Sequence, residues 1–206
     1  SRLDTMPRSI ALLVTLSFAL TASADERSLN GFLKIKSFSV PEAHQAVAVD
    51  LRSFYAISNR TIARYAKETT ESKPKAIVRW TAPAESPVKH LNSGIVLNGR
   101  LYCANSNWPK KPLRNTVEVV EAATLQHLER KEFPETEGAI NWIDRHRGGW
   151  WIVFAFYGKA DVRKTRLVRY NDDWQNTGIW TFPESVIQRF LPNSNSGGAF
   201  GPQGRL

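Results

Sequence analysis

The sequence predicts an all-β fold, and three observations support that class. Short runs of β-favouring residues follow one another at regular spacing through most of the 206 residues. The dipeptide Asn98-Gly99, which suits a type I′ turn, separates two such runs and is the strongest hairpin signal in the chain. A proline with an acidic residue close behind it recurs after every fourth run, at Pro41, Pro83, Pro134 and Pro183. Because proline cannot donate to a β-ladder, each of these prolines is expected to end an outer strand.

Composition restricts the class of protein further. The chain is 42% apolar, 11% aromatic and 23% charged, which excludes an intrinsically disordered chain. No apolar run reaches the roughly 18 residues that a membrane-spanning helix needs. Lys and Arg number 28 against 19 Asp and Glu, so the net charge of +9 favours polyanionic partners.

The N-terminus is typical of a secretory signal peptide. A basic start at Met6–Ser9 precedes the apolar stretch Ile10–Leu20, and Ala22-Ser23-Ala24 supplies the small residues of a cleavage site. A buried helix is the alternative interpretation, but it rarely combines these three features. We therefore expect a signal helix in residues 1–24, translation from Met6, and an exported chain of residues 25–206 that is periplasmic or secreted.

The strands predict an internal repeat of four antiparallel strands. The predicted sets cover about 46–82, 93–133 and 138–182, and a fourth begins at 197. Units of this length are typical of β-propeller blades, so the sequence predicts a partial propeller with about three complete blades plus part-blades. A β-sandwich also consists of short alternating strands and is the competing fold, but the four matching proline junctions favour the propeller.

Two segments flank these predicted blades. Residues 30–39 match the outermost strand of another blade, and the spacing of Val186, Ile187, Phe190 and Leu191 predicts a short helix after Pro183. Because propellers usually close with four to eight blades, the chain is expected to be a C-terminally truncated fragment of a longer protein. The lone Cys103 lies in an apolar run and is expected to be a buried small hydrophobe.

Three segments carry a resemblance to a known group. Residues 90–96 (HLNSGIV), residues 141–146 with Trp150-Trp151, and residues 193–198 (NSNSGG) resemble exported bacterial β-propeller proteins of the YVTN-like and quinoprotein-like superfamily. That superfamily includes binding scaffolds and lactone-handling enzymes, so the resemblance implies a fold more than an activity. It assigns no catalytic role to any residue of this chain.

Loops that lead into a first strand, and loops between second and third strands, share one face of a propeller and converge on its channel. Polar and aromatic residues in these loops are therefore the candidates for ligand binding: His44, His90, Asn92, Asn105, Asn107, Trp108, Lys110, Lys111, Glu137, Lys164 and Asn195. His44, His90 and Glu137 could bind a divalent metal, the one cofactor that the sequence suggests. The alternative is that each of the three hydrogen-bonds a neighbouring blade.

Basic residues are concentrated in two of these loops, at Lys110, Lys111 and Arg114 and at Lys159, Arg163, Lys164 and Arg166. We therefore predict an exported scaffold that binds an anionic ligand, such as an acidic small molecule or a polysaccharide, at its channel face. Nucleic acid is a less suitable partner, because no recognition motif is present. The alternative is a propeller enzyme of the lactonase, cycloisomerase or hydrolase type, with the His44, His90 and Glu137 side chains as metal ligands or acid and base groups.

Overall fold

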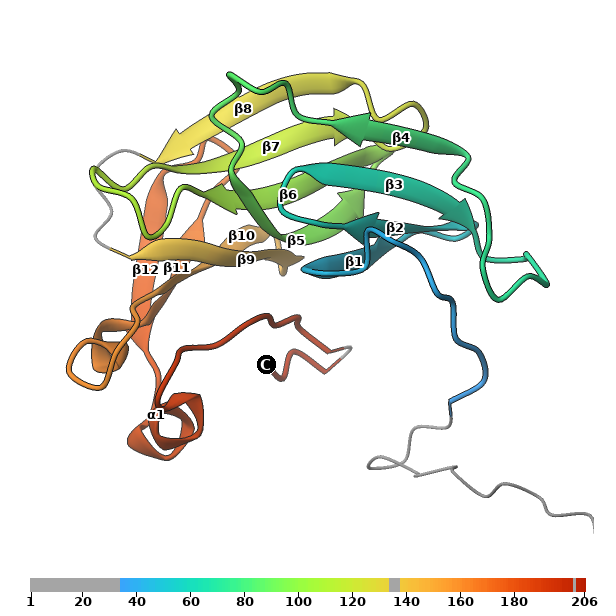
Figure 1. Ribbon diagram of the computed structural model, residues 1–206. Coiled ribbons are helices and arrows are strands. Elements are labelled where there is room, and N and C mark those ends of the chain that lie inside the picture. Colours follow the sequence, from blue (N-terminus) through green and yellow to red (C-terminus); the bar gives the residue numbers. More distant parts are fainter. Residues whose placement is uncertain (1–33, 134–137, 202) are drawn as a thin grey trace, which may run out of the picture. The chain divides into compact units, whose positions relative to one another are not determined.

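The strands of the computed structural model form three four-stranded antiparallel sheets (Figure 1). The structure describes residues 34–133, 138–201 and 203–206. Chain contacts separate Ser1–Ser37 from Phe38–Leu206, and all three sheets lie in the second unit. In each sheet, strands that are consecutive in the chain are neighbours. The predicted all-β class and four-stranded antiparallel blades are confirmed; the predicted signal helix lies outside the described residues.

Each sheet is called a blade and is numbered in chain order. Blade 1 contains β1 (Ala46–Val49), β2 (Ser53–Ile57), β3 (Thr61–Ala66) and β4 (Val78–Thr81). Blade 2 contains β5 (His90–Leu97), β6 (Arg100–Ser106), β7 (Asn115–Glu121) and β8 (His127–Phe133). Blade 3 contains β9 (Ala139–His146), β10 (Gly149–Ala155), β11 (Arg166–Tyr170) and β12 (Asn176–Thr181).

The first strands of the three blades lie side by side, with β1 against β5 and β5 against β9 (Figure 1). Gly94 permits the close approach of β1 to β5, because a Cβ at this position would lie 2.6 Å from Ile57 Cδ1 and 3.3 Å from Ala48 Cβ. This arrangement of first strands is that of a propeller rather than of two stacked sheets.

Alternation along the strands places one core on each side of blade 2. Odd-numbered β6 residues such as Leu101 and Cys103 pack against Tyr55 and Ile57 of blade 1. Ala104 of β6 faces the other way and packs with Ile152 and other residues of blade 3. Successive side chains of a strand point to opposite faces, so each blade contributes to two interfaces. Cys103 is fully buried, as predicted.

The Asn98-Gly99 turn joins β5 to β6 with φ of 49° and 75°, the positive values that a type I′ turn requires. The sequence predicted a loop over residues 90–93 and a strand from Gly94, but β5 already begins at His90. An irregularity at Asn92 allows the strand to continue past that residue, since Leu91 pairs with Asn105 and Ser93 pairs with Ala104.

The predicted helix after Pro183 is confirmed as α1 (Glu184–Phe190). Hydrogen bonds and ring contacts hold the segment that follows along β9. Asn141 Nδ2 donates to the carbonyl oxygen of Asn195, and the Phe200 N–H donates to Asp144 Oδ2 at 2.7 Å. In the described part of the chain, no helix has the length and apolar character needed to cross a membrane.

Candidate functional site

One end of the blades carries the predicted ligand-binding loops. In blade 2, the start of β5 pairs with the end of β6, which in turn pairs with the start of β7. The entry to β5 and the loop between β6 and β7 therefore lie at the same end of the blade, which we call the entry end. Strand register in blade 3 places the connection between β10 and β11 at its corresponding end.

The loop of residues 107–114 between β6 and β7 is organised by Asn107. Its Nδ2 donates to the carbonyl of Pro112 at 3.0 Å, and its Oδ1 accepts from the N–H of Arg114 at 2.7 Å. The Lys110 N–H donates to the Asn107 carbonyl at 3.0 Å. The amide of Asn107 is thus used to shape the loop that presents Lys110 and its neighbours.

The basic loops of blades 2 and 3 meet through an aromatic contact. The rings of Trp108 and Tyr157 lie 4.5 Å apart between centroids. Trp108 remains 44% exposed, so its ring stays available to a ligand. Burial raises the pKa of the Tyr157 hydroxyl above its ordinary value. These two residues join the two loops into a single surface.

Two of the predicted basic residues are already paired. Arg163 and Lys164 belong to the 3₁₀ helix η1 (Val162–Lys164) in the connection between β10 and β11. Arg163 forms an ion pair with Glu184 at 2.5 Å, and Lys164 forms one with Asp161 at 2.8 Å. Their charges are therefore partly neutralised, which reduces what they can contribute to binding an anion.

Four other cations of these loops are exposed. Within residues 34–133, 138–201 and 203–206, no ion pair forms at Lys110, Lys111, Arg114 or Lys159. We call these four, together with Trp108 and Tyr157, the basic loop surface.

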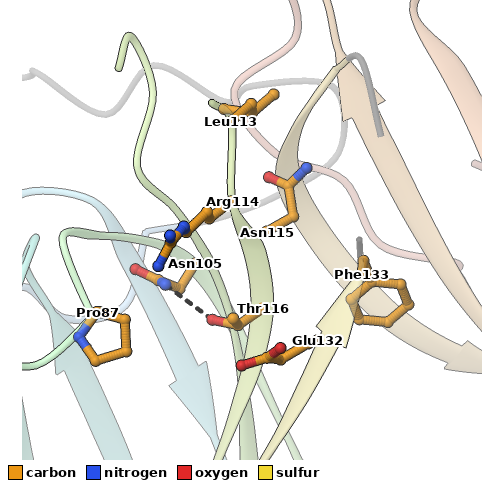
Figure 2. A pocket seen from close by; sticks show the side chains of 8 residues that line it. All are labelled: Pro87, Asn105, Leu113, Arg114, Asn115, Thr116, Glu132 and Phe133. Atoms are coloured by element: carbon orange, nitrogen blue, oxygen red, sulfur yellow. Dashed lines mark hydrogen bonds between the residues drawn. The ribbon is translucent and has the colours of Figure 1, made fainter. Parts of the chain in front are cut away.

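A pocket of about 220 Å³ lies beside this surface at the entry end of blade 2 (Figure 2). Arg114 belongs to both. The amides in the pocket wall are engaged within the protein, since Asn115 Nδ2 donates to the Gly138 carbonyl at 2.8 Å and Asn105 Nδ2 donates to Thr116 Oγ1 at 2.8 Å. The charged side chains of the lining are Arg114 and Glu132; the complete lining is Pro87, Asn105, Leu113, Arg114, Asn115, Thr116, Glu132 and Phe133.

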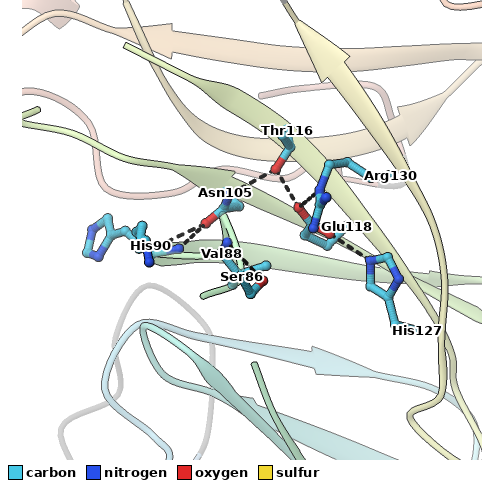
Figure 3. Close-up of polar contacts among 9 residues, drawn as sticks. Ser86, Val88, His90, Asn105, Thr116, Glu118, His127 and Arg130 are labelled. Atoms are coloured by element: carbon cyan, nitrogen blue, oxygen red, sulfur yellow. Dashed lines mark hydrogen bonds and ion pairs between the residues drawn. The ribbon is translucent and has the colours of Figure 1, made fainter. Parts of the chain in front are cut away.

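A buried polar network extends from the pocket wall into the interface between blades 1 and 2 (Figure 3). Glu118 is fully buried. Its Oε1 accepts from Thr116 Oγ1 at 2.6 Å and from Arg130 Nε at 2.8 Å, and its Oε2 lies 2.7 Å from His127 Nε2. A carboxylate with three partners can be accommodated in a core, where an unpaired one could not. Burial and the Glu118 charge raise the pKa of the Cys103 thiol, which disfavours a nucleophilic thiolate.

Two residues that we predicted in a channel-mouth loop lie in β5 instead. The His90 Nδ1–H donates to Asn59 Oδ1 at 2.6 Å, and burial lowers the pKa of this imidazole. Asn92 is buried and donates to the carbonyl of Ile140 in β9 at 3.0 Å. Both residues fall within the strand because its pairing with β6 continues to Ser106. His90 and Asn92 thus link neighbouring blades.

The other candidates lie in separate places. His44 is exposed in the turn before β1, Glu137 lies outside the described residues, and the Asn195 carbonyl accepts from Asn141. Among the residues that the structure describes, no three His, Cys, Asp or Glu side chains are grouped so that they could hold a metal ion. The metal site of His44, His90 and Glu137 stays a prediction.

Two features of the site escaped the sequence analysis. The first is the contact of Trp108 with Tyr157, and the second is the group of Glu118, His127 and Arg130. The alternation of Glu118 with Val117 and Val119 marks it as facing away from those apolar neighbours, but it does not show that a second sheet covers it. Sequence spacing offered no signal for either group.

Two of the comparisons with known proteins found no match to this chain. No protein-family model matches the sequence. The search of curated proteins likewise returned no significant match.

Three similar solved structures illustrate the level of likeness. A neuraminidase-like protein from a bat isolate from Guatemala is 12% identical over 65% of this chain and 36% of its own, with a TM-score of 0.42. A quinohemoprotein alcohol dehydrogenase from Comamonas testosteroni is 11% identical over 65% and 26%, with a TM-score of 0.44. An α-L-arabinofuranosidase from Clostridium thermocellum is 14% identical over 66% and 52%, with a TM-score of 0.43. The match thus spans about half or less of each of these three structures, and such similarities carry no argument about what this chain binds.

Proposed function

We propose that this chain is part of an exported β-propeller that binds an acidic polysaccharide through the basic loop surface. The observation that carries the proposal is the contact of Trp108 with Tyr157, because it unites the cations of two blades. Lys110 and Lys111 are exposed point charges that can attract carboxylates along a polymer. The exposed Trp108 ring offers a flat apolar face on which a sugar ring can pack.

Exposure and charge favour a polymer over a small acid. Lys110, Lys111 and Lys159 lie on an open surface rather than inside the 220 Å³ pocket, which only Arg114 of the four cations lines and whose amides are engaged within the protein. A polymer can contact several separated charges at once, and each contact adds to the affinity. We therefore choose polygalacturonate, a chain of uronic acids, as the probe.

Binding to polygalacturonate is expected to weaken steeply when NaCl rises from about 50 mM to about 500 mM, because salt screens exposed charges. Trp108→Ala is expected to weaken binding about fivefold, since it removes an apolar contact worth roughly 1 kcal/mol. Isothermal titration calorimetry measures both effects.

Trp180→Ala is the matched control, because Trp180 is 46% exposed and packs against Trp151 in blade 3. This variant should bind polygalacturonate as tightly as the unmodified protein does. Affinity that is insensitive to salt, or equal affinity for the neutral polymer dextran, would contradict the proposal.

Export of the chain rests on residues 1–24, which lie outside the described part of the structure. We expect a Gram-negative bacterium that expresses this chain with its leader to cleave it after Ala24. The mature protein should then be recovered from the periplasm or the medium and begin at Asp25. Mass spectrometry of the intact protein gives its N-terminal residue. An uncleaved cytoplasmic product beginning at Met6 would show that the segment is not a signal peptide.

A further inference from the structure

The 220 Å³ pocket at the entry end of blade 2 contains two opposite charges that do not neutralise each other. Arg114 and Glu132 both line it, and both side chains are exposed. In the part of the chain that the structure describes, neither side chain forms an ion pair, with the other or with any further group. Both charges are therefore available to a ligand that enters the pocket.

Strand register places the two charges around one position. Thr116 of β7 pairs with Glu132 of β8, so their side chains share a face of the sheet. Arg114 lies two residues before Thr116, and Figure 2 shows both charged side chains pointing to the side of the pocket where Pro87 lies. Diagonal neighbours on one face of a sheet are about 7–8 Å apart. This spacing lets two long side chains hold one small molecule between them.

The uncharged polar groups of the pocket wall are occupied by the protein itself. Asn105 Oδ1 accepts from the N–H groups of Lys89 and His90, each at 3.0 Å, and its Nδ2 donates to Thr116 Oγ1. The Thr116 hydroxyl in turn donates to the buried Glu118. The guanidinium and the carboxylate of the described lining therefore remain as the groups that can select a ligand by its charge.

This pair of charges does not favour a simple ion. A plain anion attracted by Arg114 is repelled by Glu132, and a plain cation meets the reverse arrangement. A zwitterion satisfies both groups at once. The pocket is smaller than the roughly 300–1,000 Å³ that drug-sized ligands occupy, and Pro87, Leu113 and Phe133 complete its lining with apolar groups. The matching ligand is therefore a small zwitterion with an apolar substituent.

We infer that this pocket binds an α-amino acid with an apolar side chain. The carboxylate of the ligand accepts from the Arg114 guanidinium, and its ammonium group donates to the Glu132 carboxylate. The two charge-assisted hydrogen bonds supply the preference for a zwitterion, and the apolar lining accommodates the side chain. Lys110 and Lys111 lie outside this lining, so the inference does not depend on polysaccharide binding.

Three molecules with one carbon skeleton test this inference. L-Leucine carries both charges, 4-methylpentanoate lacks the ammonium group, and 3-methylbutylamine lacks the carboxylate. Leucine is expected to bind at least about tenfold more tightly than either analogue, because each analogue loses one charge-assisted hydrogen bond. Isothermal titration calorimetry of the purified protein gives the three dissociation constants. No binding of leucine, or equal affinity for leucine and either analogue, would overturn the inference.

Matched variants assign each charge of the ligand to its partner. Glu132→Gln should lower the affinity for leucine to about that for 4-methylpentanoate, and Arg114→Gln should lower it to about that for 3-methylbutylamine. Glu129→Gln and Arg100→Gln are the controls, because they neutralise one carboxylate and one guanidinium of the same blade outside the lining. Both controls should bind leucine as the unmodified protein does. If Glu129→Gln weakens leucine binding as much as Glu132→Gln does, net charge rather than this pocket attracts leucine, and the inference is wrong.

The same variant separates this inference from the proposed function. Glu132→Gln removes a negative charge, so it should bind polygalacturonate at least as tightly as the unmodified protein while it loses its preference for leucine. Its side chain is exposed, so the midpoint of thermal unfolding should stay unchanged. A protein that binds the polymer but not leucine would overturn the inference and leave the proposed function standing.

Discussion

Changing Lys110 and Lys111 together to glutamate is expected to weaken binding to polygalacturonate about 1,000-fold. Each reversal removes one attraction and adds one repulsion, and a charge near a polyanionic surface contributes on the order of 1 kcal/mol. Both side chains are exposed, so the change should leave the stability of the fold within about 0.5 kcal/mol. Calorimetry at low salt measures the affinity, and thermal unfolding checks the fold.

The matched control reverses two lysines at the other end of the blades. Lys73 and Lys75 are exposed in the connection between β3 and β4, away from the entry end. Their replacement by glutamate changes the net charge by the same amount, so it should lower the affinity only through the weak long-range field. If both double variants weaken binding equally, the net charge of the chain rather than the basic loop surface attracts the polymer.

Glu118→Ala is expected to lower the free energy of unfolding by about 3 kcal/mol, because breaking a buried ion-pair network leaves its partners uncompensated. Arg130 Nε, Thr116 Oγ1 and His127 Nε2 would all lose the acceptor between them. Urea unfolding followed by tryptophan fluorescence measures the loss. Glu118→Gln should cost less, since the amide keeps one acceptor oxygen.

Glu129→Ala provides the comparison for Glu118. Glu129 lies on β8 and pairs with Arg100 at 3.8 Å, and each of the two side chains is about half exposed. An exposed pair of this kind contributes about 0–1 kcal/mol, so the variant should unfold nearly as the unmodified protein does. If Glu118→Ala and Glu129→Ala lower the free energy of unfolding by similar amounts, the buried network of Glu118 contributes no more to stability than an exposed ion pair does. Because Lys110 and Lys111 lie outside the network, Glu118→Ala should still bind polygalacturonate below its unfolding transition.

Local patterns in the sequence were sufficient for the strands and their order. The two positive φ values at Asn98 and Gly99 follow from residue types that tolerate them, and the alternation in β6 follows from a strand that has a core on each side. The predicted start of β5 at Gly94 was wrong, because the strand already begins at His90. His90 and Asn92 belong to it through pairing with β6 and contacts with neighbouring blades. Such pairing leaves no mark in the local hydrophobic pattern.

By itself, the sequence determined the all-β class, the blades of four antiparallel strands and the presence of two basic loops, because these depend on residues that are close together in the chain. Only the tertiary structure decided which charges are available. Arg163 and Lys164 are paired, whereas Lys110 and Lys111 are exposed, and the contact of Trp108 with Tyr157 joins loops from different blades. The reason is physical: an ion pair or a ring contact depends on distance in space, and residues from separate blades come within that distance only when the sheets pack.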